Sequence, residues 1–281
     1  ALPQNETASR GLLRFAETVF QRSFGCDVWA NAEIAREGLR LSVLAGDNRN
    51  QLFVKAFFGM AMAELGDYDA AQTILREEVA LARERNEPLL ETHATVMLEQ
   101  MELESGMTIP LDRLASLGIG EDARINPLLR GQATGNAASA LLRLGQISEA
   151  ESTARRALTA LRHAPAYWIH ALPTLILSLL RQSRATEASQ VAAEGLALCT
   201  SFGCGGVSEI SVRTAAAEVQ YALAKLDDAK EQLRLAQKAL SVRAQHIPIP
   251  ALRERFLRTS PQGRRVDELI RRWTITGDGL L

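Results

Sequence analysis

The stretch AELGDYDAAQ, from Ala63 to Gln72, reads as the end of one helix, a Gly-Asp turn and the start of a second helix. With Gly66 as an anchor, equivalent turn positions can be found along the rest of the chain. They recur 38 to 41 residues apart, at Gly25, Gly66, Gly106, Gly145, Ser183 and Ala224. A fixed period of this length is the signature of a repeat architecture, in which each repeat is one supersecondary unit.

Three further columns follow the same period. Five residues after the anchors, where a second helix needs a small side chain to pack against the first, stand Ala30, Ala71, Leu111, Ala150, Ala188 and Ala229. Nine residues after them, all positions are apolar: Ile34, Leu75, Ala115, Ala154, Ala192 and Leu233. Seven residues before them, four positions are small and Glu99 departs from the pattern, the column being Thr18, Gly59, Glu99, Ala138, Ile176 and Ala217.

Helical periodicity runs through nearly every segment of the chain, and alternating strand patterns with Asn-Gly turns are absent. The sequence therefore predicts an all-α protein of about six helical hairpins. A hairpin of this length cannot bury its apolar face alone, so neighbouring hairpins must stack. An irregular helical bundle with chance spacing is the alternative.

These columns resemble the tetratricopeptide repeat (TPR), whose helix pairs carry a small residue in the first helix, Gly at the turn and Ala in the second helix. The best copies supply Gly59, Gly66, Tyr68 and Ala71, then Ala138, Gly145, Ile147, Ala150, Ala157 and Leu158. The period near 40 exceeds the usual 34 of the family, which longer helices would explain. The resemblance implies a right-handed α-α superhelix, a TPR-like solenoid, over residues 1–245.

The third copy, TIPLDRLASLGIGEDARINP from Thr108, leaves room for only a short second helix between Pro110 and Pro127. A defect in the stack is expected there.

The resemblance also implies that ligands bind the concave wall, which is formed by the first helix of each pair. Its ligand-facing positions include Phe53, Met60, His93, Gln100, Gln132, Asn136, Ser139, Arg143, His170, Arg181, Glu218 and Tyr221. From these, the predicted partner-binding groove consists of Gln132, Asn136, Ser139, Arg143, His170, Arg181 and Tyr221. Two arginines in matched repeat positions could hold an acidic group or a C-terminal carboxylate, because guanidinium binds carboxylate in a bidentate fork. The alternative is that all of these are ordinary helix residues.

The C-terminal segment IPIPALRERFLRTSPQGRRVDELIRRW, Ile247 to Trp273, differs from the repeats. It resembles the closing segment of helical-repeat regions in bacterial, myxobacterial-type Ser/Thr kinase and NTPase signalling proteins, over roughly residues 205–275. The matching residues are Phe256, Leu257, Pro261, Arg265, Glu268, Leu269, Arg271 and Trp273, whereas Ser260 and Asp267 stand where that pattern is commonly apolar. The segment 246–281 is predicted to be a capping helix and tail. In the helix Pro261 is first, Leu269 and Trp273 cover the last repeat, and four arginines face water: Arg264, Arg265, Arg271 and Arg272.

The charge balance of the chain narrows the classes of binding partner that are expected. Lys+Arg 32 against Asp+Glu 33 gives a formal charge of −1, so the usual electrostatic reason to expect nucleic acid or an anionic membrane is missing. The arginine cluster of the cap could instead touch nucleic acid, but no aromatic residues are interleaved with it. Three cysteines and no visible signal peptide are typical of a cytoplasmic protein.

Motifs for catalysis are missing. The chain has no phosphate-binding G-x-x-x-x-G-K-[ST] loop, no kinase motifs and no G-x-S-x-G turn. Cys199 and Cys204 lack the further ligands of a zinc site. We therefore expect no enzyme activity, no cofactor and no metal.

Two functional hypotheses remain. The first is a non-catalytic interaction or sensor module of a larger signalling protein, whose kinase or NTPase domain lies outside this chain; a start at Ala1 rather than Met favours it. The second is a stand-alone TPR regulator, transcriptional or sensing a peptide or metabolite, that changes its superhelical shape when a ligand binds. The expected partner in both is a protein or peptide.

Overall fold

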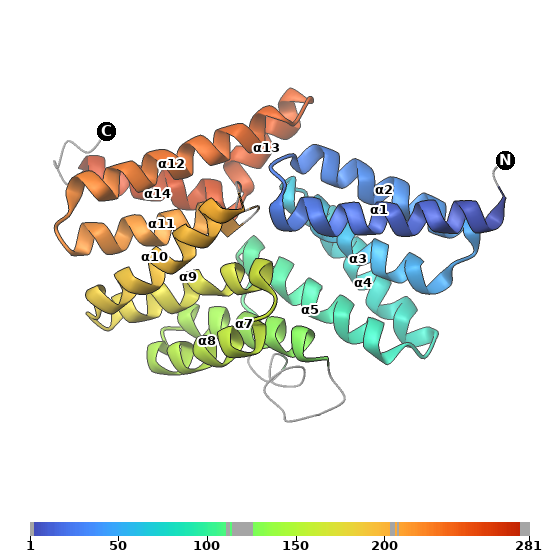
Figure 1. The fold of residues 1–281 in the computed structure, drawn as a ribbon, viewed down its shortest axis with the longest axis horizontal. Helices are drawn as coiled ribbons and strands as arrows, with labels where there is room; N and C mark the ends of the chain where they lie inside the picture. Colours follow the sequence, from blue (N-terminus) through green and yellow to red (C-terminus); the bar gives the residue numbers. More distant parts are fainter. Residues whose placement is uncertain (1–2, 111–112, 114–125, 203–205, 207, 276–281) are drawn as a thin grey trace.

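The structure is a computed structural model that describes residues 3–110, 113, 126–202, 206 and 208–275. In these residues every regular element is an α-helix, which confirms the predicted all-α class. The helices follow one another in pairs (Figure 1). The paired helices are α1 Gln4–Phe24 with α2 Val28–Ala45, α3 Asn48–Glu64 with α4 Tyr68–Glu84, α7 Pro127–Arg143 with α8 Ile147–Leu161, α9 Pro165–Arg181 with α10 Ala185–Ser201, and α11 Ser208–Ala222 with α12 Leu226–Gln245. The other described helices are α5 Pro88–Ser105, α13 Pro250–Thr259 and α14 Pro261–Ile275. None of the described helices is long and apolar enough to cross a membrane.

The predicted turns lie between paired helices. Gly66, Gly145, Ser183 and Ala224 share a left-handed backbone, with φ of 79°, 79°, 61° and 58°. Gly25 also lies in a turn, but its φ of −86° and ψ of 156° are extended. The common conformation supports the repeat register, because four anchors chosen from spacing alone occupy the same place in the turn. The predicted short second helix of the third copy falls almost entirely outside the described residues.

Ala224 should be improved by glycine. An L-residue in the left-handed region costs roughly 1–2 kcal/mol, whereas glycine adopts it freely and loses about 0.5–1 kcal/mol in backbone entropy. Ala224→Gly is therefore expected to stabilise the chain by up to about 1 kcal/mol, raising Tm by roughly 2 °C in a thermal melt. The exposed, mid-helical Ala193 is the control, because Ala193→Gly should lower Tm. A fall in Tm for both variants would contradict the left-handed turn.

The small-residue columns lie at helix contacts. Ala71, Ala150, Ala188 and Ala229 are all fully buried, and Ala30 is half-buried. Of the second column, Leu75, Ala154, Ala192 and Leu233 are buried and Ile34 is half-buried, while Leu111 and Ala115 lie outside the described residues. Tight packing between paired helices is thus built on the alanines that reveal the repeat.

Glu99 breaks the small-residue column and is nevertheless fully buried. Burial raises its pKa to about 8, and Arg113, whose Nε lies 3.9 Å from Glu99 Oε1, only partly offsets that cost. This favours the protonated, neutral form of the carboxyl group at neutral pH, and the neutral form lowers the cost of burying it at this position.

The C-terminal cap contains two helices, where the sequence predicts one. α13 ends at Thr259, and the extended backbone of Ser260 separates it from α14, which starts at Pro261 as predicted. Leu269 and Trp273 are buried as predicted. The cap departs from the prediction at another residue too. Arg265 is only half-exposed, because it forms ion pairs with Glu218 of α11 and with Glu268.

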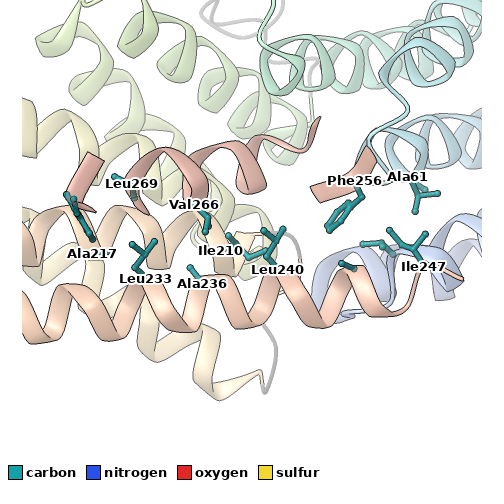
Figure 2. Close-up of a cluster of buried hydrophobic side chains, with 14 of the residues drawn as sticks. Ala61, Ile210, Ala217, Leu233, Ala236, Leu240, Ile247, Phe256, Val266 and Leu269 are labelled. Carbon is teal, nitrogen blue, oxygen red and sulfur yellow. The ribbon is translucent and has the colours of Figure 1, made fainter. Parts of the chain in front are cut away.

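The cap also joins the end of the helical array to its beginning. One apolar cluster contains residues of α2 and α3 together with residues of α11, α12, α13 and α14. Figure 2 shows Phe256 of α13 beside Ile247 and Ala61, and Leu269 of α14 on the side of Ala217 and Leu233. The first two pairs and the cap therefore share one core.

Polar contacts reinforce this closure. His246, after α12, lies 3.4 Å from Asp27 in the first turn, and Arg255 of α13 forms a 2.8 Å ion pair with Asp67 in the second turn. In Figure 1 the C-terminal end of α12 reaches the first pair. On another side, the ring of Phe24 lies 4.9 Å from that of Phe202 at the end of α10. These contacts bring the two ends of the array of helices together. The surface that the pairs turn toward one another, called the inner surface below, therefore faces other parts of the same chain.

Candidate functional site

A small cleft lies on this inner surface, where α1, α5, α7, α9 and α11 converge. Its volume is about 50 Å³. By the same measure one water molecule needs about 10–15 Å³, so the cleft can enclose a small polar group but no length of peptide chain. The polar part of the lining comes from Arg22, Ser23, Gln100, Gln132, Asn136, Ser139, Tyr167, His170 and Ser208.

Four of the seven predicted groove residues line this cleft. Gln132 and Asn136 are buried, and Asn136 Nδ2 donates to the carbonyl oxygen of Val96 on α5 at 3.0 Å. Ser139 shares a 2.9 Å hydrogen bond with Thr174, and His170 Nδ1 lies 3.4 Å from Ser208 Oγ. The spacing of the repeats thus brings together residues from neighbouring first helices.

Gln132 has an unused acceptor. Its Nε2 donates to the carbonyl oxygen of Leu128 at 3.5 Å, but its buried Oε1 has no hydrogen-bond partner among the described residues. A buried acceptor without a donor costs about 1–3 kcal/mol. The cleft is therefore a polar site whose hydrogen bonds are incomplete.

The other three predicted residues contact the chain itself. Arg143 donates to the carbonyl oxygens of Leu103 at 2.6 Å and Gly106 at 2.7 Å, and Arg181 donates to that of Leu142 at 3.0 Å. Leu103 and Leu142 each lie three residues before an anchor, so the two arginines cap equivalent positions at the ends of α5 and α7. Each carbonyl also accepts from the N–H of its anchor glycine, Leu103 from Gly106 and Leu142 from Gly145, so the arginine is a second donor to it. Tyr221 stacks on Trp273 of the cap, with ring centroids 4.9 Å apart and an interplanar angle of 9°.

The remaining predicted wall residues lie outside the cleft, except Gln100, which donates to Glu104 Oε1 at 2.8 Å. His93 is buried against Phe53 and Phe57, with ring centroids 5.4 and 5.7 Å away, and burial lowers its pKa to about 4. Met60 is in the apolar core, and Glu218 pairs with Arg265. The N-terminal part of the wall is thus aromatic and apolar.

Arg22 is the charged residue of the cleft that the predicted groove does not include. It lies three residues before Gly25, as the predicted ligand-facing residue Tyr221 lies three residues before Ala224, so the repeat positions could have identified it. Its Nε lies 3.3 Å from Glu64 Oε1, and Arg243 of α12 approaches Glu64 Oε2 at 3.7 Å. All three side chains are almost completely buried.

This cluster holds more positive than negative charge. Two guanidinium groups flank one carboxyl group, and burial raises the pKa of Glu64 more than the arginines lower it. The neighbouring Glu104 lies 3.8 Å from His170, and burial raises the pKa of Glu104, which favours its neutral form. His170 exposes 40% of its side chain to solvent. Beside the cleft, two guanidinium groups thus stand against one carboxyl group.

Within the described residues, no group of three or more His, Cys, Asp or Glu side chains is placed to hold a metal ion. Comparison of the chain with models of known protein families and with curated proteins found no match.

Proposed function

We propose that the chain is a TPR-like, non-catalytic interaction module that binds an acidic group of a protein or peptide in the cleft beside Arg22. The 38 to 41 residue period, the paired helices and the buried alanine column support the TPR-like part of this proposal. In it the pairs form a right-handed superhelix, and α13 and α14 cap its end.

The observation that carries the binding proposal is the combination of charge and incomplete hydrogen bonding in one cleft. Arg22 supplies a guanidinium group, and its carboxyl partner Glu64 is shared with Arg243. Gln132 supplies a buried acceptor oxygen that has no donor. A carboxylate can bind the guanidinium group while a neighbouring N–H of the same ligand donates to Gln132. A C-terminal residue or an Asp or Glu side chain of a peptide has both groups.

The size of the cleft limits what enters it. The cleft of about 50 Å³ encloses only a small group, so the rest of the ligand lies outside it, beside the exposed part of His170. This assigns the role of carboxylate anchor to Arg22, because Arg143 and Arg181 do not line the cleft and each already donates to a main-chain carbonyl.

The module works in the cytoplasm as part of a bacterial signalling protein, and the partner is another protein or a kinase or NTPase domain of the parent polypeptide. The support for this context is the resemblance of the C-terminal segment and the scarcity of cysteines.

Arg22→Met tests the anchor, because methionine keeps an unbranched stem and removes the guanidinium group. The probe is a fluorescent pool of decapeptides with Asp or Glu at alternate positions and a free C-terminus, followed by polarisation. We expect Kd to rise at least tenfold, about 1.4 kcal/mol. The control is Arg14→Met, on the more exposed side of the same helix, which should leave Kd unchanged. Equal Kd values for the two variants would refute the anchor.

A second candidate function, a regulator that changes shape on binding, is favoured by the closure contacts at Asp27 and Asp67. If the same peptide pool bound without changing the radius of gyration, this candidate would be rejected and the binding proposal would stand.

A further inference from the structure

Arg22 belongs to the cleft and to a buried ion pair at the same time. Its side chain lines the cleft, and its Nε lies 3.3 Å from Oε1 of Glu64 on α3. The side chains of Arg22 and Glu64 expose only 11% and 3% of their surface. A carboxylate that binds Arg22 in the cleft would therefore be the second acidic group on a guanidinium that Glu64 already contacts.

The surroundings of Glu64 offer little that could offset another negative charge. A cavity of about 10 Å³ beside Glu64 has room for one water molecule at most. Solvent therefore screens this carboxyl group poorly. The polar and titratable groups that face it from the elements packed around it are Arg22 of α1, Asn31 of α2, Tyr68 of α4, Glu104 of α5, Arg243 of α12, and Ser260 and Gln262 of the cap.

A ligand carboxylate on Arg22 changes the charge that Glu64 can keep. Two like charges at a shared, poorly solvated site disfavour the ionised form of each. Burial already raises the pKa of Glu64 more than Arg22 and Arg243 lower it, so a further rise needs only the second carboxylate. A proton on Glu64 removes the repulsion and leaves the guanidinium group of Arg22 to the ligand.

We propose that binding of an acidic group beside Arg22 is coupled to the uptake of a proton by Glu64, so that the cleft binds its ligand more tightly as pH falls. This inference rests on the proposed function of the cleft and adds the regulation of that site. The sign follows from linkage, because the complex holds the proton more tightly than the free chain does. Affinity is highest below the pKa of Glu64 in the free chain and falls as pH rises through its pKa in the complex.

Two other groups near the cleft have to be separated from Glu64. His170 lines the cleft, and its protonation would also favour an acidic ligand. Glu104 lies 3.8 Å from His170 and accepts a 2.8 Å hydrogen bond from Gln100, which is another residue of the cleft. Glu64 differs from both because it is the carboxyl group that lies against Arg22.

The test measures affinity and proton uptake together, with the complete chain and a decapeptide of alternating Ala and Glu that has a free C-terminus. The acidic groups of this peptide are ionised above about pH 5.5. We expect Kd to rise at least tenfold between about pH 5.5 and about pH 8.5, as a shift of one pKa unit or more in Glu64 requires. Calorimetry in two buffers with different heats of ionisation should show uptake of up to about one proton per bound peptide.

Glutamine variants assign the proton. Glu64→Gln resembles the protonated carboxyl group, so its Kd should not change with pH and it should take up no proton. The matched control is Glu17→Gln, at the exposed partner of Arg14, which should keep the full pH dependence. Glu104→Gln and His170→Gln should each keep the proton uptake.

The outcomes separate this inference from the proposed function. Peptide binding without proton uptake in the unmodified chain would overturn the coupling and leave the anchor role of Arg22 intact, and this measurement does not depend on how well Glu64→Gln folds. Uptake that persists in Glu64→Gln, or that disappears in Glu104→Gln or His170→Gln, would also overturn it. Absence of peptide binding at every pH would refute the proposed function and the coupling together.

Discussion

Glu64→Ala is expected to lower the free energy of unfolding by about 3–5 kcal/mol, because two buried guanidinium groups lose the acceptor that they share, and a buried charged donor without an acceptor costs more than the roughly 1–3 kcal/mol of a neutral one. Glu64 exposes only 3% of its side chain, and it is the carboxyl group that both Arg22 and Arg243 approach. Alanine would leave two buried guanidinium groups without it. Because Arg22 comes from α1 and Arg243 from α12, the loss should also loosen the contact between the two ends of the array.

Urea unfolding followed by circular dichroism measures this effect. The control is Glu17→Ala, whose carboxylate pairs with Arg14 at the surface, and a loss below about 1 kcal/mol is expected there. Glu64→Gln should fall between the two, because it keeps the shape and an acceptor oxygen. Similar stability of Glu64→Ala and Glu17→Ala would mean that the buried cluster does not hold the ends together.

Burial of Glu64 also determines whether its contribution to stability rises or falls with pH. Its pKa is raised in the folded state, so the folded chain binds this proton more tightly than the unfolded chain does. The contribution of Glu64 to stability is therefore present at low pH and is lost as pH rises from the ordinary glutamate pKa through the raised one. Glu64→Gln should remove this part of the pH dependence.

Trp273→Ala is expected to cost a similar amount, about 3–5 kcal/mol, because a large side chain in a packed core leaves a cavity. Trp273 is buried in the cluster that joins α14 to α11 and α12, and its ring stacks on Tyr221. Its loss should release α14 first. Increased proteolysis after Arg264 or Arg265 would report that release before global unfolding.

Ile249→Ala is the matched control, since Ile249 precedes α13 and is exposed. Its change should stay within about 0.5 kcal/mol. Equal stability and equal proteolysis of the two variants would show that the cap is not held by Trp273.

Short-range features of the fold were predictable from the sequence. A turn and a buried alanine follow from residues a few positions apart, such as Gly66 and Ala71, so their recurrence at one period located five helix pairs. The closure was not predictable in this way. Asp67 and Arg255 are far apart in the chain, and both residue types are ordinary at a helical surface. No local pattern indicates that they meet.

The candidate site, too, could be predicted from the sequence only in part. Repeat positions grouped Gln132, Asn136, Ser139 and His170, and these four line one cleft because equivalent residues of adjacent first helices point the same way. The same positions could not tell whether a guanidinium group faces a ligand or the carbonyl groups at the end of the neighbouring helix, and Arg143 and Arg181 donate to such carbonyls. The cap was predicted as one helix because Pro250 was not used as a helix start, although it is the first residue of α13.

Contacts of α12 and the cap with the first two pairs close the array of helices on itself. The 30.7 kDa chain exposes 13,006 Å², close to the roughly 12,000 Å² of an average compact monomer of this mass. Small-angle X-ray scattering measures the closure in solution. The closed form predicts a radius of gyration near 19 Å, which should increase when Arg255→Glu and Trp273→Ala are combined. A radius several ångströms larger for the unmodified chain, unchanged by those two substitutions, would contradict the closed structure.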